Sequence, residues 1–226
     1  MSDRVALAVM ARAPSDARGK TRLLTSLGLC DGTDLRRAIL LDTLEVVQQV
    51  AGVEPVVVFA PETGGAEIAG LIGGDFRVLA QRGGDLGERL RLAFADLFAL
   101  GYSAVAIIGS DLPTLPAEHV ERGLDVLRCE VDPLVLGPAL DGGYYLIGLR
   151  ANHPEIFHKI PWSTAGVLAA TLSAAEAHRL SVTLIPSWYD VDSIDDLRRV
   201  LELPTAGTRT PRRTHQWATA RFSEPD

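Results

Sequence analysis

The chain has 226 residues, of which 47% are hydrophobic and 23% charged, a globular composition that excludes a disordered, collagen-like or coiled-coil chain. Its formal net charge of −7 argues against sequence-independent nucleic-acid binding, which needs a basic surface. No apolar run approaches the roughly 20 residues that span a bilayer, and Arg12 interrupts the apolar run near the N-terminus. We therefore expect a cytoplasmic protein with no nucleic-acid and no membrane partner.

Short apolar segments alternate with segments of helical periodicity along the chain. The predicted strands are residues 5–10, 56–60, 76–80, 104–108, 133–137, 144–149 and 182–185. The predicted helices are residues 34–50, 62–72, 85–100, 116–127, 164–179 and 194–203. This alternation is typical of βαβ units and predicts an α/β fold, with a mainly parallel central sheet and helices on both faces. We expect one domain over residues 1–203 and a loose Arg/Thr/Pro-rich tail over residues 204–226.

A cluster of positive charge follows the first predicted strand. Three Arg and one Lys fall within eleven residues of an acidic protein, and they repel one another unless an anion lies among them. These residues are Arg12, Arg18, Lys20 and Arg22. Gly19 can also offer a backbone N–H group to a phosphate ahead of a helix that begins at Thr21. The cluster predicts an anion site, with a solvated loop as the alternative.

The Gly19-Lys20-Thr21 sequence also invites comparison with P-loop kinases. Their loop needs a glycine five residues before the Gly-Lys pair, where this chain has Pro14. Proline lacks the N–H group and cannot form that turn in the usual way. The apolar residues 105–108 leading to Asp111 are compatible with a Walker B strand, so a P-loop kinase stays a lesser alternative.

Two carboxylates at the ends of predicted strands indicate a divalent metal site. Asp111 follows the fourth strand and Asp190 the last one. Ligands of parallel sheets bind beyond the carboxyl ends of the strands, and Mg²⁺ takes one or two carboxylates together with phosphate oxygens. We assign Asp190 to the metal and Asp192 to the cap of the last helix, which begins just after it. The alternatives are the reverse assignment, a cap at Ser193, and a turn role for Asp111.

Two glycine pairs have both a structural and a functional interpretation. Gly83 and Gly84 precede the helix at 85–100, where they can cradle a base or a sugar or serve as the flexible entry to a helix capped by Asp85. Gly142 and Gly143 follow Asp141 in a turn that admits close approach of a ligand or simply closes a hairpin.

Trp162 and Ser163 precede the helix predicted at 164–179. The indole face can pack on a sugar ring or fill the core, and Ser163 or Thr164 can cap the helix. The two cysteines, Cys30 and Cys129, allow one disulfide. The five histidines have no zinc-site spacing, and the chain has no G-x-S-x-G motif.

Seven segments in order along the chain resemble bacterial GT-A-type nucleotide-diphospho-sugar transferases, of the kind described as arsenosugar-biosynthesis glycosyltransferases. The segments are residues 5–14, 19–23, 83–89, 109–113, 137–149, 161–164 and 190–192. The resemblance covers residues 4–203, with Thr114 where many members carry a smaller residue. Three of the segments are also similar to guanylyltransferases that activate phospholactate or phosphoenolpyruvate. The Asp141-Gly142-Gly143-Tyr144-Tyr145 turn favours the glycosyltransferase branch.

The resemblance implies a single GT-A-like domain that uses Mg²⁺ or Mn²⁺. The implied reaction transfers a sugar from a nucleotide-diphosphate sugar to a small-molecule acceptor. The alternative is a nucleotidyltransferase that joins a nucleoside triphosphate to a phosphorylated small acid or sugar phosphate and releases pyrophosphate. A catalytically silent nucleotide-binding protein is a lesser alternative, and a homodimer is left open.

The motifs and the resemblance together predict four sets of site residues. The catalytic set is Asp111, Asp141, the candidate base for an acceptor hydroxyl, and Lys20. The nucleotide-binding set is Ala11, Arg12, Lys20, Arg22, Gly83, Gly84 and Arg89. The acceptor-binding set is Gly142, Gly143, Tyr144, Trp162 and Ser163, and the metal set is Asp111 and Asp190.

Overall fold

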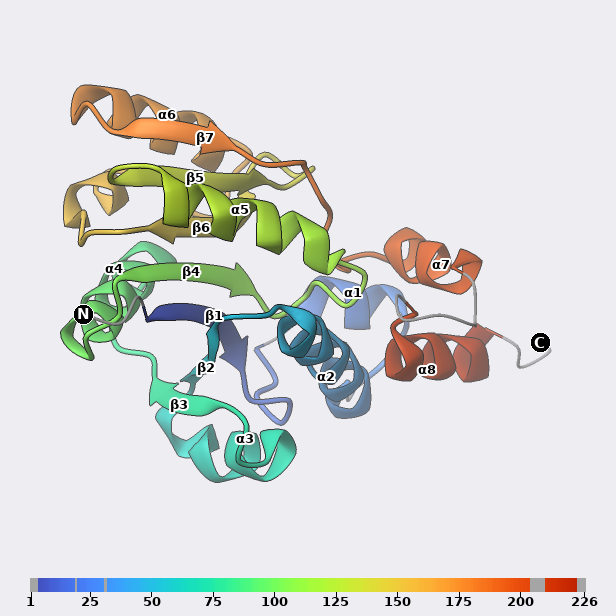
Figure 1. Ribbon diagram of the computed structural model, residues 1–226. Coiled ribbons are helices and arrows are strands. Elements are labelled where there is room, and N and C mark those ends of the chain that lie inside the picture. The colour runs from blue at the N-terminus through green and yellow to red at the C-terminus, as the bar shows by residue number, and fades with distance from the viewer. Residues whose placement is uncertain (1–3, 19, 31, 204–209, 223–226) are drawn as a thin grey trace.

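A seven-stranded sheet in the order β3-β2-β1-β4-β6-β5-β7 forms the centre of the computed structural model, which describes residues 4–18, 20–30, 32–203 and 210–222 (Figure 1). The strands are β1 (Val5–Arg12), β2 (Glu54–Ala60), β3 (Arg77–Ala80), β4 (Ala104–Gly109), β5 (Pro133–Pro138), β6 (Tyr144–Leu149) and β7 (Ser181–Leu184). All neighbouring strands pair in parallel except β6, which runs antiparallel to both β4 and β5. The predicted α/β fold with a mainly parallel sheet is confirmed.

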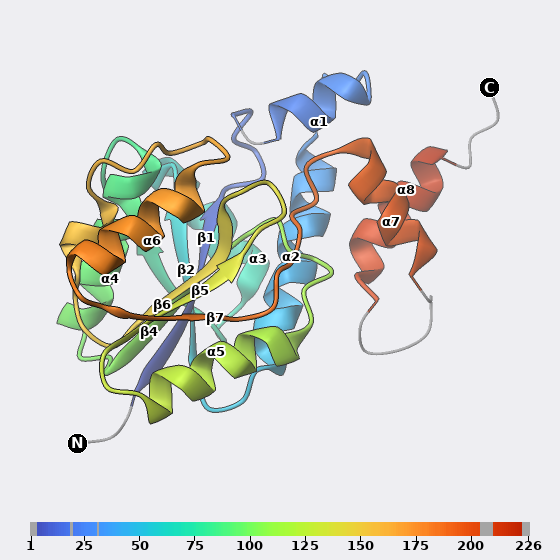
Figure 2. The same ribbon diagram turned by 90° about the horizontal axis from the view of Figure 1, so that it is seen from above.

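Helices lie on both faces of this sheet, and others group at one end of it (Figure 2). They are α1 (Thr21–Ser26), α2 (Thr33–Gln49), α3 (Gly65–Ile72), α4 (Leu86–Ala99), α5 (Ala117–Cys129), α6 (Val167–Ala177), α7 (Ile194–Glu202) and α8 (Arg212–Phe222), with short turns η1 (Glu62–Gly64) and η2 (Pro154–Phe157). No helix within the described ranges is long and apolar enough to cross a bilayer.

The side chains of β1 divide between the two faces, because successive residues of a strand point in opposite directions. Leu7 and Val9 pack in the core beneath α2, α3 and α5, whereas Ala6 and Ala8 pack beneath α4, η2 and α6. Each large side chain buried in this way contributes about 1.5–3 kcal/mol to folding. The near-continuous apolar sequence of β1 therefore follows from burial on both faces.

A third, smaller core joins the helices at one end of the sheet. Its buried members come from α1, α2, the segment before α7, and α7 itself, with a partly buried Trp217 from α8. The buried residues are Leu23, Leu24, Leu27, Leu35, Ile39, Val191, Leu197 and Val200. This core packs the beginning and the end of the chain against one another.

The expected loose tail is wrong for residues 212–222, which form α8 and pack against α2 and α7 (Figure 1). Thr214 and Ala218 are fully buried, and the carboxylate of Asp42 accepts a hydrogen bond from the Thr214 N–H group at 2.7 Å. The helix is weakly apolar by sequence, and tertiary contacts stabilise it. The rest of the expected tail, residues 204–209 and 223–226, lies outside the described residues.

Two expected helix caps differ from the structure. Helix α6 begins at Val167 after Gly166, because the Thr164 hydroxyl folds back to donate to the Pro161 carbonyl and accept from the Gly166 N–H group. Helix α7 has Ser193 as its cap, in a reciprocal capping box with Asp196. The preferred cap Asp192 is therefore wrong, and the Ser193 alternative is confirmed.

The disulfide that the two cysteines allow does not form. Cys30 and Cys129 are both exposed and free.

Candidate functional site

A cleft of two adjoining chambers lies at the carboxyl ends of β1, β3 and β4, with volumes of about 650 and 450 Å³. The larger, which we call the basic chamber, is lined by Arg12, Arg18, Lys20, Arg36 and Arg89 together with Asp85 and Asp111. The smaller, the aromatic chamber, is lined by Tyr144, Tyr145, Trp162, Asp141 and Asp190 among others. The two share Met10, Leu86, Gly109, Trp162 and Ser163 as a common wall.

The direction of β6 explains why the turn at 139–143 reaches this cleft. Because β6 is antiparallel, its first residue lies at the edge where its neighbours end, so the turn joining β5 to β6 lies at that same edge. The segment after β7 then crosses this edge toward β4. Its Trp188 N–H donates to the Pro138 carbonyl at 3.0 Å and its Val191 N–H donates to the Asp111 carbonyl at 2.9 Å.

Lys20 lies among the carboxylates that this crossing brings together. Its Nζ is 2.8 Å from Oδ1 of Asp192 and 3.2 Å from Oδ1 of Asp111, and it donates to the Val191 carbonyl at 2.5 Å. Its side chain is only 4% exposed. Burial disfavours the charged amine, but the charges of Asp111 and Asp192 outweigh burial and raise the pKa of Lys20. The ammonium group is therefore a fixed counter-charge at the junction of the chambers.

Asp190 is the carboxylate of this cluster that has an oxygen without a hydrogen-bond partner among the described residues. Its Oδ1 is buried with no hydrogen-bond partner in the described part of the chain. Burial, followed by the charges of Asp111 and Asp192, raises the pKa of Asp190 to about 7. A buried, unpartnered carboxylate oxygen near a second carboxylate fits a divalent cation, because the cation would satisfy the oxygen and relieve the repulsion.

The described residues contain no group of three or more His, Cys, Asp or Glu side chains that could enclose a metal ion. A cation at Asp111 and Asp190 would therefore take its remaining ligands from water or from a bound substrate. This is the usual arrangement for Mg²⁺, which keeps several waters and binds through one or two carboxylates and substrate phosphates.

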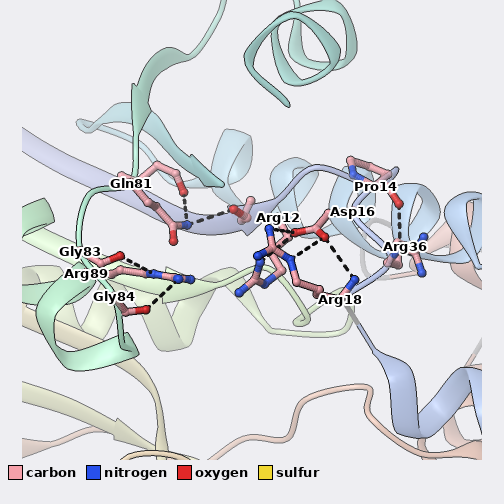
Figure 3. A network of polar contacts seen from close by, with 11 residues as sticks. Arg12, Pro14, Asp16, Arg18, Arg36, Gln81, Gly83, Gly84 and Arg89 are labelled. Atoms are coloured by element: carbon pink, nitrogen blue, oxygen red, sulfur yellow. Dashed lines mark hydrogen bonds and ion pairs between the residues drawn. The ribbon is translucent and has the colours of Figure 1, made fainter. Parts of the chain in front are cut away.

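Asp16 holds two of the chamber's arginines in fixed positions (Figure 3). Its Oδ2 accepts from Arg12 Nη1 at 2.8 Å, and its Oδ1 accepts from Arg18 Nε at 3.0 Å. Hydrogen bonds from Arg18 and then Arg12 lower the pKa of Asp16 to about 2 despite partial burial. Beneath the same loop, Arg36 donates from Nε to the Pro14 carbonyl at 2.6 Å. The predicted nucleotide-binding set includes Arg12 but not Arg36, and not Arg18, although Arg18 belongs to the positively charged cluster that predicts an anion site.

The carbonyl groups of Gly83 and Gly84, the glycine pair before α4, accept hydrogen bonds from Arg89 (Figure 3). Arg89 donates from Nε to the Gly83 carbonyl at 3.2 Å and from Nη2 to the Gly84 carbonyl at 2.8 Å. Gly84 lines the basic chamber, but Gly83 is not among its lining residues and acts through this bond. Asp85 caps α4 by accepting from the Glu88 N–H group at 2.8 Å, as the sequence predicts.

Gln81 orders the floor of the basic chamber beside these residues. Its amide Nε2 donates to the carbonyl of Ala11 at 3.0 Å and to that of Val58 at 2.8 Å, which links β1, β2 and the end of β3. Ala11, a predicted nucleotide contact, lines the chamber at this point. Gly19, whose N–H group was expected to help bind an anion, lies outside the described residues.

The predicted acceptor residues gather around the aromatic chamber with one exception. Asp141, Gly143, Tyr144, Trp162 and Ser163 line it. Gly142 does not: it adopts a φ of +91°, and a Cβ there would lie 2.3 Å from the Ala165 carbonyl oxygen. Gly142 therefore lets the turn pack against the start of α6, which a sequence motif cannot distinguish from ligand contact.

Two other predicted residues have environments that the sequence did not indicate. Arg22 lines the aromatic chamber, beside Asp141 and Asp190, although we grouped it with the nucleotide-binding residues. Burial raises the pKa of the Tyr144 hydroxyl, so Tyr144 stays protonated and offers its ring, which meets Trp162 edge-on with centroids 6.4 Å apart.

Comparison with protein families and solved structures agrees with this fold. The family model described as "Uncharacterized protein conserved in bacteria (DUF2064)" matches residues 43–164. A crystal structure from Desulfovibrio desulfuricans G20, provisionally described as a nucleotide-diphospho-sugar transferase, has a TM-score of 0.85 and 29% identity, covering 98% of this chain and 97% of its own. No curated protein matches the chain.

Two more distant structures share the fold alone. Rv0371c of Mycobacterium tuberculosis H37Rv in complex with manganese has a TM-score of 0.57 and 19% identity, covering 89% of this chain and 100% of its own. CMP:2-keto-3-deoxy-manno-octonic acid synthetase complexed with CTP has a TM-score of 0.55 and 14% identity, with 87% and 96% covered. The predicted nucleotide-diphospho-sugar transferase fold is confirmed, which leaves the P-loop kinase alternative without support.

The close packing of Trp162 on α4 gives a direct test of the wall between the chambers. A Cβ at Gly87 would lie 2.1 Å from Trp162 Nε1, so Gly87→Ala must displace the indole. We expect a destabilisation of about 1–3 kcal/mol and a shifted tryptophan emission maximum, measured by thermal unfolding and fluorescence.

Gly70→Ala is the matched control, because a Cβ at Gly70 in α3 meets nothing within 4 Å. It should leave the emission unchanged and stabilise α3 by up to about 1 kcal/mol through helix propensity. Equal behaviour of the two variants would contradict the packing of Trp162 on Gly87.

Proposed function

The chain belongs to the DUF2064 family, and we propose that it is a metal-dependent transferase that acts on a nucleotide. The observation that carries this proposal is the junction of the two chambers, which Lys20 and Asp111 border on one side and Asp190 on the other. The basic chamber has the charge to hold a nucleotide's phosphates, and the aromatic chamber has the apolar and polar groups to hold a small acceptor.

The reaction that we propose first is transfer of a sugar from a nucleotide-diphosphate sugar to that acceptor. Arg12 and Arg89 bind and orient the phosphates, and Lys20 adds positive charge beside them. The Trp162 ring provides a face on which a sugar can stack. Asp141 accepts the proton of the acceptor hydroxyl. The Gly143 N–H group donates to Oδ1 of Asp141 at 2.9 Å and so orients this carboxylate. Asp111 and Asp190 would hold Mg²⁺ or Mn²⁺, which supplies positive charge to the leaving phosphate when bound.

Nucleotidyl transfer to a phosphorylated small acid or sugar phosphate is the second candidate, and the charge of the basic chamber favours it. Five cationic side chains line this chamber against the carboxylates of Asp85 and Asp111, and Asp16 and Asp192 pair with three of the five, so one positive charge remains in excess. This excess suits a triphosphate, which carries more charge than the diphosphate of a nucleotide sugar. In that reaction Lys20 and the arginines would neutralise the departing pyrophosphate.

A mass-spectrometric turnover panel with Mg²⁺ or Mn²⁺ separates the two reactions. One arm offers GTP, CTP, UTP and ATP with phosphoenolpyruvate, phospholactate, phosphoglycerate and sugar phosphates. The other offers UDP- and GDP-sugars without an acceptor. We expect free nucleoside diphosphate from one nucleotide sugar. Pyrophosphate with an acid-linked or sugar-linked nucleotide would instead establish nucleotidyl transfer.

Lys20→Ala tests the phosphate role of the lysine. We expect it to weaken nucleotide binding with Mg²⁺ present by about 1–3 kcal/mol, because Asp111 and Asp192 lose the ammonium group that offsets their negative charge beside the phosphates. Calorimetry measures the affinity. Lys159→Ala is the control, since Lys159 is the chain's other lysine and lines neither the basic nor the aromatic chamber. Equal affinities of the Lys20 variant and the wild type would refute the role.

Asp190→Asn tests the metal assignment through two opposite effects. Above pH 7, where Asp190 is ionised in spite of its raised pKa, removing the charge of this buried carboxylate should raise the melting temperature of the metal-free protein. The same change should lower Mn²⁺ affinity roughly 10-fold or more, read from the paramagnetic resonance signal of free Mn²⁺. Asp195→Asn serves as control, because the Asp195 side chain is 79% exposed on α7. Unchanged Mn²⁺ affinity in the Asp190 variant would remove Asp190 from the metal site.

A further inference from the structure

Two adjacent buried residues of α2 contact different parts of the molecule. The Thr43 hydroxyl donates to the Ser110 carbonyl at 3.0 Å and accepts from the Leu112 N–H group at 3.1 Å, which holds the loop that carries Asp111. Asp42, one residue earlier, has a side chain that is fully buried and faces α8. The loop of Asp111 and the docking of α8 therefore depend on separate side chains of one helix.

The contact of Asp42 with α8 is a charged anchor at a helix start. Its Oδ2 accepts from the Thr214 N–H group at 2.7 Å, and its Oδ1 accepts from Arg213 Nη1 at 3.1 Å. The first N–H groups of a helix lack partners within the helix and carry partial positive charge. A buried carboxylate at that point satisfies both needs, so undocking α8 would break the hydrogen bonds that join Asp42 to Thr214 and Arg213.

The other end of α8 reaches α1. Arg221 donates from Nη2 to the Leu27 carbonyl at 3.2 Å. Leu27 is the residue that caps the C-terminal end of α1. Between these two anchors, Trp217 packs on the third core defined above. Figure 2 shows α1, α7 and α8 grouped beside α2 at the same end of the sheet. Helix α8 therefore closes this core on its outer side.

The third core supports the charged cluster at the chamber junction. Helix α1 begins immediately after Lys20, and its Leu23 and Leu24 are core members. Val191 lies between Asp190 and Asp192 in sequence and is fully buried in the same core. Displacement of this core would therefore move Lys20 and the segment 190–192 relative to Asp111.

We propose that Asp42 is a positioning residue and that α8, docked on it, holds Lys20 and the segment 190–192 in the arrangement that binds metal and phosphate. The assignment of metal and phosphate as the ligands of this arrangement rests on the proposed function. The inference predicts which segments loosen and which do not, because Thr43 holds the loop of Asp111 through hydrogen bonds that do not involve α8. Loss of the Asp42 anchor should loosen α8, α1 and 190–192 but leave β4 and residues 109–112 in place.

Hydrogen exchange of the full chain, followed by mass spectrometry, tests this prediction in Asp42→Ala. We expect faster exchange in α8, α1 and 190–192, with wild-type protection in β1, β4 and 109–112. Mn²⁺-dependent binding of inorganic pyrophosphate, measured by calorimetry well below the melting temperature, should weaken about 2- to 30-fold. Glu45→Gln is the matched control, because Glu45 pairs with the same Arg213 at 2.6 Å but at an exposed position. It should change neither measurement.

The proposal is wrong if α8 exchanges faster in Asp42→Ala while α1, 190–192 and pyrophosphate affinity stay as in the wild type. Arg221→Gln provides a milder second variant should Asp42→Ala not fold. It removes only the bond to Leu27, so faster exchange is expected in α1 and not at the N-terminus of α8. Unchanged exchange in α1 would equally overturn the proposal. Wild-type protein that binds no pyrophosphate would contradict the proposed function, and the exchange pattern would still decide the positioning role.

Discussion

The concentration of negative charge at one edge of the sheet is the constraint on which the rest of the structure depends. Asp111, Asp141 and Asp192 all act on Asp190 by charge repulsion, and Lys20 is the ammonium group that opposes them. A buried carboxylate surrounded by like charges is unfavourable unless a cation lies among them. The loop after β1 has to place Lys20 at this point, and the segment after β7 has to cross the sheet edge to meet it.

Positive charge on the other side of the cleft is organised in a different way. Asp16, with a pKa held near 2 by its two arginine partners, stays ionised over the whole physiological range. Arg12 and Arg18 are therefore fixed before any ligand arrives, so less conformational entropy is lost on binding. The cleft thus combines an array of guanidinium groups with a cluster of carboxylates whose negative charge exceeds the single positive charge of Lys20.

Sequence patterns were enough to predict the fold and most of the cleft, because both follow from local rules. Apolar runs identified all seven strands, and Asp111 was found because a residue that ends a parallel strand must lie at the ligand edge. Asp192 was misassigned because its partner Lys20 is 172 residues away and no local pattern connects them. Helix α8 was missed for the same reason, since its anchor Asp42 is remote in sequence and looks like a surface residue of α2. Gly142 was grouped with the acceptor-binding residues because a glycine that packs against a neighbouring segment and one that faces a ligand look alike in sequence.

Because β6 runs in the reverse direction, the two chambers of the cleft are lined by different parts of the sequence. The groups lining the basic chamber come from residues up to Asp111, apart from Trp162 and Ser163, whereas most of those lining the aromatic chamber come from residues after 138. Each half of the gene therefore encodes mainly one chamber. Point mutations or exchanges within the turn at 139–143 and the segment at 164–167 can alter the aromatic chamber while the arginine array stays intact. Lineages that share this scaffold can thus diverge in one chamber at a time, with the other conserved.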